Sequence, residues 1–312
     1  MNYNNLDELN YKDDEIDLRE LFGIFWKGKW LLIGITSLFS IAAVVYSLSL
    51  PNIYHSSALL SPVGNQSSMN QALRSYGGLA NIAGINLPSS GDVSKTDKAL
   101  EKLESLSFFT ENIMPNIYLP DLMAIESWDA ASNTIVYNNK VFNEEKQLWV
   151  RDFQYPKNQI PSAQESFKVF KSSLKVVKDN KNGFISILVN HQSPYVAKVW
   201  VELIVDQLNY FYRSKDRLEA EAAVDYLNIQ IAKTSFTEIK QVIAQLLQQK
   251  TQQLTLIEVN EFYVFDYIDP PSVMEEKAEP SRAIICILGA LLGGIIGVIV
   301  VLINFFFINR KH

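Results

Sequence analysis

The chain has 312 residues, of which 48% are hydrophobic and 20% charged, with a formal net charge of -6. These averages are typical of a globular protein, and the net acidity argues against nucleic-acid binding. The hydrophobic residues, however, are concentrated in two long runs, and these runs determine how the chain is organised.

Both runs are long enough to form membrane-spanning helices. Trp30–Leu50 and Ala283–Ile308 contain no charged residue, and a spanning helix needs about 20 apolar residues. A cleaved signal peptide is the alternative for the first run. Its apolar stretch is longer than the roughly 7–15 residues of the apolar core of a signal peptide and follows a long N-terminal segment, so we favour a retained anchor.

The charges beside the two runs predict their orientation. Lys27 and Lys29 precede the first run, and Arg310 and Lys311 follow the second. Because cationic residues mark cytoplasmic flanks, we expect both termini in the cytoplasm and the middle of the chain outside it. The predicted parts are an N-terminal tail (1–29), a first helix (30–50), an external domain (51–282), a second helix (283–308) and a C-terminal end (309–312).

The external domain has to fold by packing alone. The single cysteine, Cys286, lies in the second apolar run, so no disulfide can form within residues 51–282. About 230 residues can bury a sizeable hydrophobic core.

The first part of this domain combines a strand, a loop and a helix. We expect a strand over 53–62 and a loop over the glycine- and serine-rich residues 63–92. A helix follows over 95–114, because leucines recur there at helical spacing, and Pro115 and Pro120 close it. The aromatic-rich stretch from Trp128 to Tyr155 shows no clear period and receives no assignment.

The pattern becomes clearer after Pro161. Residues 161–177 predict a helix that runs into a strand. Asn182-Gly183 lies between two alternating runs and predicts a β-hairpin. Residues 264–271 predict a strand that returns the chain beside its first strand.

A very long helix is predicted after the hairpin. Ser193 and Pro194 suit its N-cap and first position, and no glycine or proline occurs between Tyr195 and Asp269. Roughly 60 helical residues would extend about 90 Å. The apolar stripe on such a helix must be covered by another helix or another copy of the chain. The fold class is therefore α+β with a very long helix, anchored by two transmembrane helices.

Glutamines gather in the second half of this predicted helix. A solvated helix face is the simpler interpretation; a hydrogen-bonding face toward a neutral polymer or a partner subunit is the alternative. The residues are Gln241, Gln245, Gln248, Gln249, Gln252 and Gln253.

No arrangement of residues points to catalysis. His55, His191 and His312 are far apart in the sequence, and none has a second ligand at metal-binding spacing. The only thiol lies in a predicted membrane helix. We therefore expect no enzyme activity, no metal and no cofactor.

One motif in the second apolar run does suggest a mechanism. Gly289, Gly293 and Gly297 form two overlapping GxxxG steps. Glycines at this spacing clear one helix face of side chains, so that another helix can approach closely. The predicted partner is the first helix or a neighbouring subunit, although membrane helices are also glycine-rich by chance.

Four stretches together resemble a known family. They are Asp14–Gly34 before and within the first helix, "YHSSALLSP" (54–62), "SYGGLANIAGI" (75–85) and the proline-containing stretch 262–297. They are similar to the polysaccharide co-polymerases, the Wzz-type chain-length determinants of lipopolysaccharide O antigen. One departure is that Met274 and Ala278 stand where the family pattern suggests prolines.

The resemblance implies a function. Such proteins are ring-like homo-oligomers in the bacterial inner membrane with a periplasmic domain, and they are not enzymes. They set the modal length of glycan made by a Wzy-type polymerase, so the implied partners are further copies, the polymerase, the lipid-linked glycan polymer and the membrane. For Pro270, Pro271 and Pro280 we expect a role in orienting the domain, since proline fixes φ and blocks helix continuation.

Two alternatives stay open at this point. The first is an inner-membrane adaptor for polysaccharide export, which calls for longer coiled coils with a clear heptad repeat. The second is a sensor, which calls for a recognisable output domain in the cytoplasmic tail, and residues 1–29 contain none.

Overall fold

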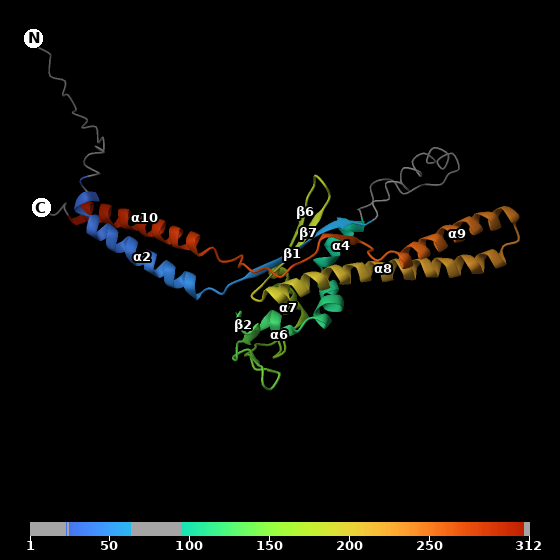
Figure 1. Cartoon of the computed structure of the whole chain (residues 1–312), viewed down its shortest axis with the longest axis horizontal. Helices are drawn as coiled ribbons and strands as arrows, with labels where there is room; N and C mark the ends of the chain where they lie inside the picture. Colours follow the sequence, from blue (N-terminus) through green and yellow to red (C-terminus); the bar gives the residue numbers. More distant parts are fainter. Residues whose placement is uncertain (1–22, 24, 64–94, 309–312) are drawn as a thin grey trace, which may run out of the picture. The chain divides into compact units, whose positions relative to one another are not determined.

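The computed structural model describes residues 23, 25–63 and 95–308 (Figure 1). The chain divides into two compact units, Met1–Pro51 with Glu279–His312 and Asn52–Ala278. The expectations for the tail before residue 23, for the loop from residue 64 onward and for the charged residues after Ile308 lie outside the described residues.

Two apolar helices dominate the first unit. They are α2 (Lys29–Ser49) and α10 (Arg282–Ile308), and they pack against each other. Both are long and apolar enough to cross a membrane, as the two hydrophobic runs predict. Most of their large apolar side chains are exposed, which suits helices surrounded by lipid.

A four-stranded antiparallel sheet forms the centre of the second unit, in the order β6-β7-β1-β8. Its strands are β1 (Tyr54–Pro62), β6 (Leu174–Lys178), β7 (Ile185–His191) and β8 (Phe265–Asp269). The first and last strands of the unit are hydrogen-bonded neighbours, with Leu60 opposite Tyr267. The predicted return of the chain beside its opening strand is confirmed.

Alternating burial gives the sheet one core-facing side. Ala58 and Leu60 of β1 are fully buried, as are Ile185, Ile187 and Val189 of β7, while the residues between them are partly exposed. This period of two is the strand pattern of a sheet covered on one face.

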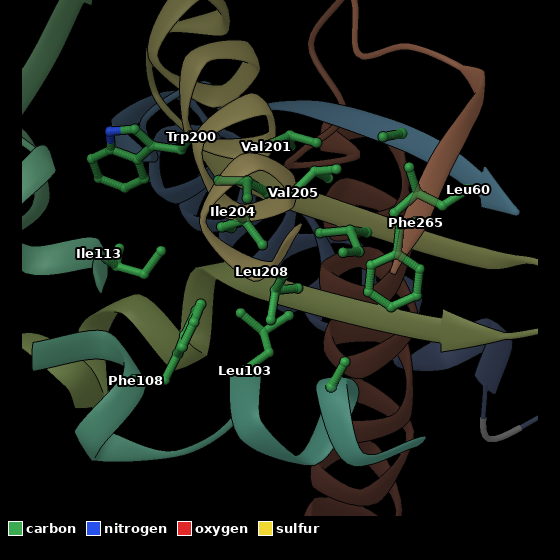
Figure 2. Packing of buried hydrophobic residues seen from close by; sticks show 14 of the residues in the cluster. Leu60, Leu103, Phe108, Ile113, Trp200, Val201, Ile204, Val205, Leu208 and Phe265 are labelled. Atoms are coloured by element: carbon green, nitrogen blue, oxygen red, sulfur yellow. The ribbon is translucent and has the colours of Figure 1, made fainter. Parts of the chain in front are cut away.

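The first half of the helix α8 (Pro194–Lys233) packs on the sheet, and the core forms around it. Figure 2 shows its side chains beside those of β1, β8 and the helices near residues 95–113. The repeat of buried α8 residues at three- and four-residue spacing explains why this face is covered. The core residues that Figure 2 labels are Leu60, Leu103, Phe108, Ile113, Trp200, Val201, Ile204, Val205, Leu208 and Phe265.

The helix predicted over 95–114 is broken into pieces. They are α4 (Lys95–Leu103), α5 (Leu106–Phe108), the π-helical turn η1 (Phe109–Ile113) and the 3-10 turn η2 (Met114–Asn116). The break occurs because Ser105 caps a new turn, its hydroxyl accepting the Phe108 N–H at 3.2 Å. Pro120 was expected to close the helix, but it lies in the first turn of α6 (Leu119–Met123), where proline is well tolerated.

The helix, strand and hairpin predicted after Pro161 are confirmed. α7 (Ala163–Ser173) leads directly into β6, and a reciprocal capping box of Ser162 and Glu165 starts it. β6 pairs with β7 through a turn in which Gly183 has a φ of +77°. This left-handed conformation favours glycine, which explains the value of the Asn-Gly signal.

Two small hairpins occupy the aromatic-rich stretch that the sequence left unassigned. β2 (Ile125–Asp129) pairs with β3 (Thr134–Tyr137), and β4 (Phe142–Asn143) pairs with β5 (Leu148–Trp149). Asn133 and Gln147 adopt positive φ in these turns, so the turns lack the glycine by which a sequence usually indicates a hairpin.

The prediction of one continuous helix of roughly 60 residues is wrong. α8 spans 40 residues and ends at Lys233, and α9 (Thr237–Val259) folds back along it (Figure 1). Thr234 and Phe236 adopt extended conformations between the two helices. The break follows a hydrogen bond from the Thr234 hydroxyl to the Gln230 carbonyl, and it lets α9 cover part of the apolar stripe of α8.

Candidate functional site

The structure places the three glycines of the GxxxG steps on the face of α10 that contacts α2. A Cβ added at Gly289 would lie 2.3 Å from the Ala43 Cβ, and one at Gly293 would lie 2.7 Å from the Phe39 Cβ. At Gly297 the nearest atom is the Leu32 carbonyl oxygen at 3.4 Å. We call these three positions the glycine face.

Gly294 provides an internal comparison. It follows Gly293 directly, yet a Cβ added there would meet nothing within 4 Å. The close approach of α2 therefore involves one side of α10 only. Since helix packing in lipid depends on shape more than on water exclusion, the missing side chains are what permit this contact.

The three prolines are divided between the two units. Pro270 and Pro271 directly follow β8 in the second unit, with Pro270 exposed and Pro271 buried, whereas Pro280 belongs to the first unit. Their proposed role in orienting the domain stays a prediction.

The chain after β8 is fixed to the opening strand, and we call residues 270–278 the returning segment. The Ser56 hydroxyl, which is fully buried, donates to the Ser272 carbonyl at 2.8 Å. The Ala278 N–H donates to the Ile53 carbonyl at 2.8 Å. Ala278 is one of the two positions at which the family pattern suggests proline, and a proline there could not make this bond.

Buried Asn209 of α8 fixes the start of β8, and sequence reasoning missed it. Its Oδ1 accepts the N–H groups of Val264 and Phe265 at 2.7 and 3.0 Å, and its Nδ2 donates to the Phe265 carbonyl at 3.0 Å. The amide thus satisfies three backbone groups that the core would otherwise leave without partners. The available signal was an amide inside an otherwise apolar helix face.

Two further α8 side chains, one and two turns later, extend this contact. The Arg213 guanidinium donates to the carbonyls of Asn260 and Glu261. Asp216 accepts the Tyr263 hydroxyl at 2.6 Å and pairs with Lys95 at 2.6 Å. Burial and the nearby Asp216 carboxylate raise the pKa of Tyr263, so its hydroxyl stays a donor. We call Asn209, Arg213 and Asp216 the α8 clamp.

The outer surface of the α8–α9 hairpin keeps exposed apolar side chains. They come from both helices and are exposed to solvent in the single chain. We call them the hairpin surface: Leu218, Tyr226, Ile229, Val242, Leu246 and Leu256.

The glutamine cluster lies mainly on the outside of α9. Gln241, Gln245, Gln248 and Gln252 are exposed at a spacing of four, three and four residues, so they share the face opposite buried Ile243. Gln249 is also exposed, and half-buried Gln253 accepts from Lys250 at 3.0 Å. A solvated helix face accounts for this arrangement.

The histidines and the cysteine that the structure describes lie in different elements, with His55 in β1, His191 in β7 and Cys286 in α10. His191 is buried between a Ser193 N–H at 3.0 Å and the Asp121 carbonyl at 2.9 Å, and burial lowers its pKa. Cys286 lies in α10, and His312 lies outside the described residues. Within residues 23, 25–63 and 95–308, no group of three His, Cys, Asp or Glu side chains could hold a metal ion.

Comparison with known proteins gives a match to a family model and a likeness to solved structures. Residues 14–108 match the family model of Wzz, chain length determinant protein. The chain is similar to a full-length bacterial polysaccharide co-polymerase at 14% identity, covering 94% of this chain and 99% of that one with a TM-score of 0.41. It is also similar to a fragment of WzzB, a polysaccharide co-polymerase from Salmonella Typhimurium, at 12% identity, covering 73% and 100% with a TM-score of 0.28. No curated protein matches the chain.

The matched residues include α2, β1, α4 and α5, and so run from the first apolar helix through the opening strand into the core. Three of the four stretches that carry the sequence resemblance lie entirely within this match, namely Asp14–Gly34, 54–62 and 75–85. The resemblance is thereby confirmed over residues 14–108, which match the Wzz chain length determinant family.

Proposed function

We propose that this protein regulates the modal chain length of lipopolysaccharide O antigen, or of a related surface polysaccharide, made by a Wzy-type polymerase. It acts as a regulator and catalyses no step itself. The observation that carries the proposal is the match of residues 14–108 to the chain length determinant family.

The proposed topology follows from the helices and the charges. α2 and α10 cross the bacterial inner membrane, Lys27 and Lys29 stay in the cytoplasm, and residues 51–282 fold in the periplasm. Both ends of the periplasmic domain are thus anchored. The sheet supports this arrangement, because its first and last strands are neighbours.

The working form is a homo-oligomer with the membrane helices at its base. The hairpin surface supports this proposal, because six exposed apolar side chains on two helices need a partner. A neighbouring copy would offer the same helices for packing. The lipid-linked glycan and the polymerase are the other partners that we propose.

The test is a silver-stained gel of lipopolysaccharide from a strain lacking this gene, with and without its restoration. We expect the ladder to lose its preferred length on deletion and to regain it on restoration. If total surface polymer falls while the preferred length stays the same, length control is wrong and the export-adaptor alternative takes its place.

A further inference from the structure

A surface loop of the second unit carries two aromatic side chains that lie largely outside the hydrophobic core. Residues 151–160, which we call the aromatic loop, connect β5 to α7. Tyr155 is 94% exposed and Phe153 is 52% exposed. Rings with this exposure bury little area within the fold and leave their faces open to a ligand.

The loop is held in place by a network around Arg151. The guanidinium donates to Glu165 through Nη1 and Nη2 at 3.0 and 2.9 Å, and to the backbone carbonyls of Gln159 and Asn158 at 2.9 and 2.6 Å. Hydrogen bonds from Arg151 and from the Ser162 N–H lower the pKa of Glu165 to about 2, so the pair is charged at neutral pH. Arg151 at the start of the loop is therefore bonded to residues at its end, and these bonds fix the conformation of the backbone that carries the two rings.

The rings stand beside polar groups and a hollow in the surface. Residues 151–157 line an open pocket of about 490 Å³ that includes Asp152, Phe153, Gln154 and Tyr155. The two cationic side chains of the loop both pair with Glu165. Lys157 lies 3.5 Å from its carboxylate, and Arg151 forms the bidentate pair described above. A ligand would therefore meet aromatic faces, an amide and a carboxylate, without a surplus of positive charge.

This set of groups suits a sugar. The flat C–H face of a pyranose stacks on an aromatic ring, and amide and carboxylate oxygens accept hydrogen bonds from its hydroxyl groups. The hairpin surface has a different composition, since it is built mainly from Leu, Ile and Val, as in the core of a protein interface. The contrast favours a glycan at the aromatic loop and a further copy of the chain at the hairpin surface.

We propose that the aromatic loop binds sugar residues of the polysaccharide whose length the protein regulates, with Phe153 and Tyr155 as stacking platforms and Asp152 and Gln154 as hydrogen-bonding groups. The identity of this ligand rests on the proposed function. The proposal assigns a glycan contact to a defined segment of the periplasmic domain.

The test measures binding to the full-length protein in detergent by isothermal titration calorimetry. The probe is the polysaccharide released by mild acid from the lipopolysaccharide of the same strain. Phe153→Ala and Tyr155→Ala should each weaken binding by about 3- to 10-fold, the loss expected for one aromatic contact. Tyr155→Phe keeps the ring and should bind like the unchanged protein.

Tyr210→Ala is the matched control, because it removes a ring that is 65% exposed on α8 and belongs neither to the loop nor to the hairpin surface. Its affinity for the polysaccharide should not change. Absence of binding by the unchanged protein, unchanged affinity in both loop variants, or an equal loss in Tyr155→Phe would overturn the proposal. A change in oligomer size in Tyr155→Ala with unchanged glycan affinity would also overturn it, in favour of a contact between copies.

The two proposals fail separately. If deletion of the gene alters the ladder but the loop variants bind glycan normally, only the assignment of the aromatic loop is wrong. If deletion leaves the ladder unchanged, the proposed function is wrong, whatever the loop binds.

Discussion

The glycine face and the α8 clamp join segments of the chain by opposite means. α10 approaches α2 where three residues have no side chain, so the contact depends on shape. α8 joins residues 260–265, which lead into β8, through three polar side chains that bond to backbone and hydroxyl groups. The difference follows from the surroundings. Lipid provides no hydrophobic driving force for helix association, so the contact between α2 and α10 depends on close packing. A buried amide in a water-facing domain is costly unless it is hydrogen-bonded.

The largest expected effect is on the glycine face. Gly293→Leu has to force α2 away, because even its Cβ would lie 2.7 Å from the Phe39 Cβ and 3.0 Å from the Thr36 Cα. We expect a cost of about 3 kcal/mol, at the upper end for overpacking, measured as a lower melting temperature of the full chain in detergent. Gly294→Leu is the control and should change little. Equal effects in both variants would contradict the one-sided contact.

The next effect is on the α8 clamp. Asn209→Ala removes the partners of the Val264 and Phe265 N–H groups and of the Phe265 carbonyl, at a cost of about 2 kcal/mol. The melting temperature should fall by about 4–8 °C, while exposed Asn228→Ala should leave it nearly unchanged. A neutral Asn209→Ala would show that water replaces the amide.

A smaller effect is expected where the chain departs from the family pattern. Ala278→Pro removes the hydrogen bond to the Ile53 carbonyl and should destabilise the protein by about 1 kcal/mol. Met274→Pro is the comparison, since the Met274 N–H does not donate to the opening strand as the Ala278 N–H does. Thermal unfolding of the two variants checks the difference, and greater stability of Ala278→Pro would contradict the assigned bond.

The smallest effect is a pH dependence in the aromatic loop. The pKa of Glu165 is lowered from 4.5 to about 2, so its charged pair with Arg151 stabilises the folded state above pH 4.5. This contribution is lost as the pH falls from 4.5 toward 2. Glu165→Gln should therefore melt below the unchanged protein at pH 7, and the difference should shrink across that interval. A difference that does not vary with pH would argue against the ion pair.

The sequence predicted those parts of the fold whose signals are local. The two apolar runs form α2 and α10, and the Asn182-Gly183 pair lies in the turn that connects β6 to β7. Ser193 caps α8 as expected, its hydroxyl accepting the Val196 N–H. In each case neighbouring residues determine the conformation, either through periodicity or through a turn that needs glycine.

The parts that could not be predicted depend on distant residues. α8 ends at Lys233 without glycine or proline, because the gain from folding α9 back onto it outweighs the helix propensity of the intervening residues. Asn209 contacts a segment 56 residues later, and nothing near either position announces the contact. The GxxxG steps did indicate a helix partner, but only the structure shows that α2 occupies this face.

The most direct test of the account combines the membrane contact with the proposed function. Gly293→Leu and Gly294→Leu are each restored to the deletion strain at equal protein levels, and the lipopolysaccharide ladders are compared on one gel. The account predicts that Gly294→Leu restores the preferred chain length and Gly293→Leu does not. Full restoration by Gly293→Leu would contradict it, because length control would then not need α10 to pack on α2.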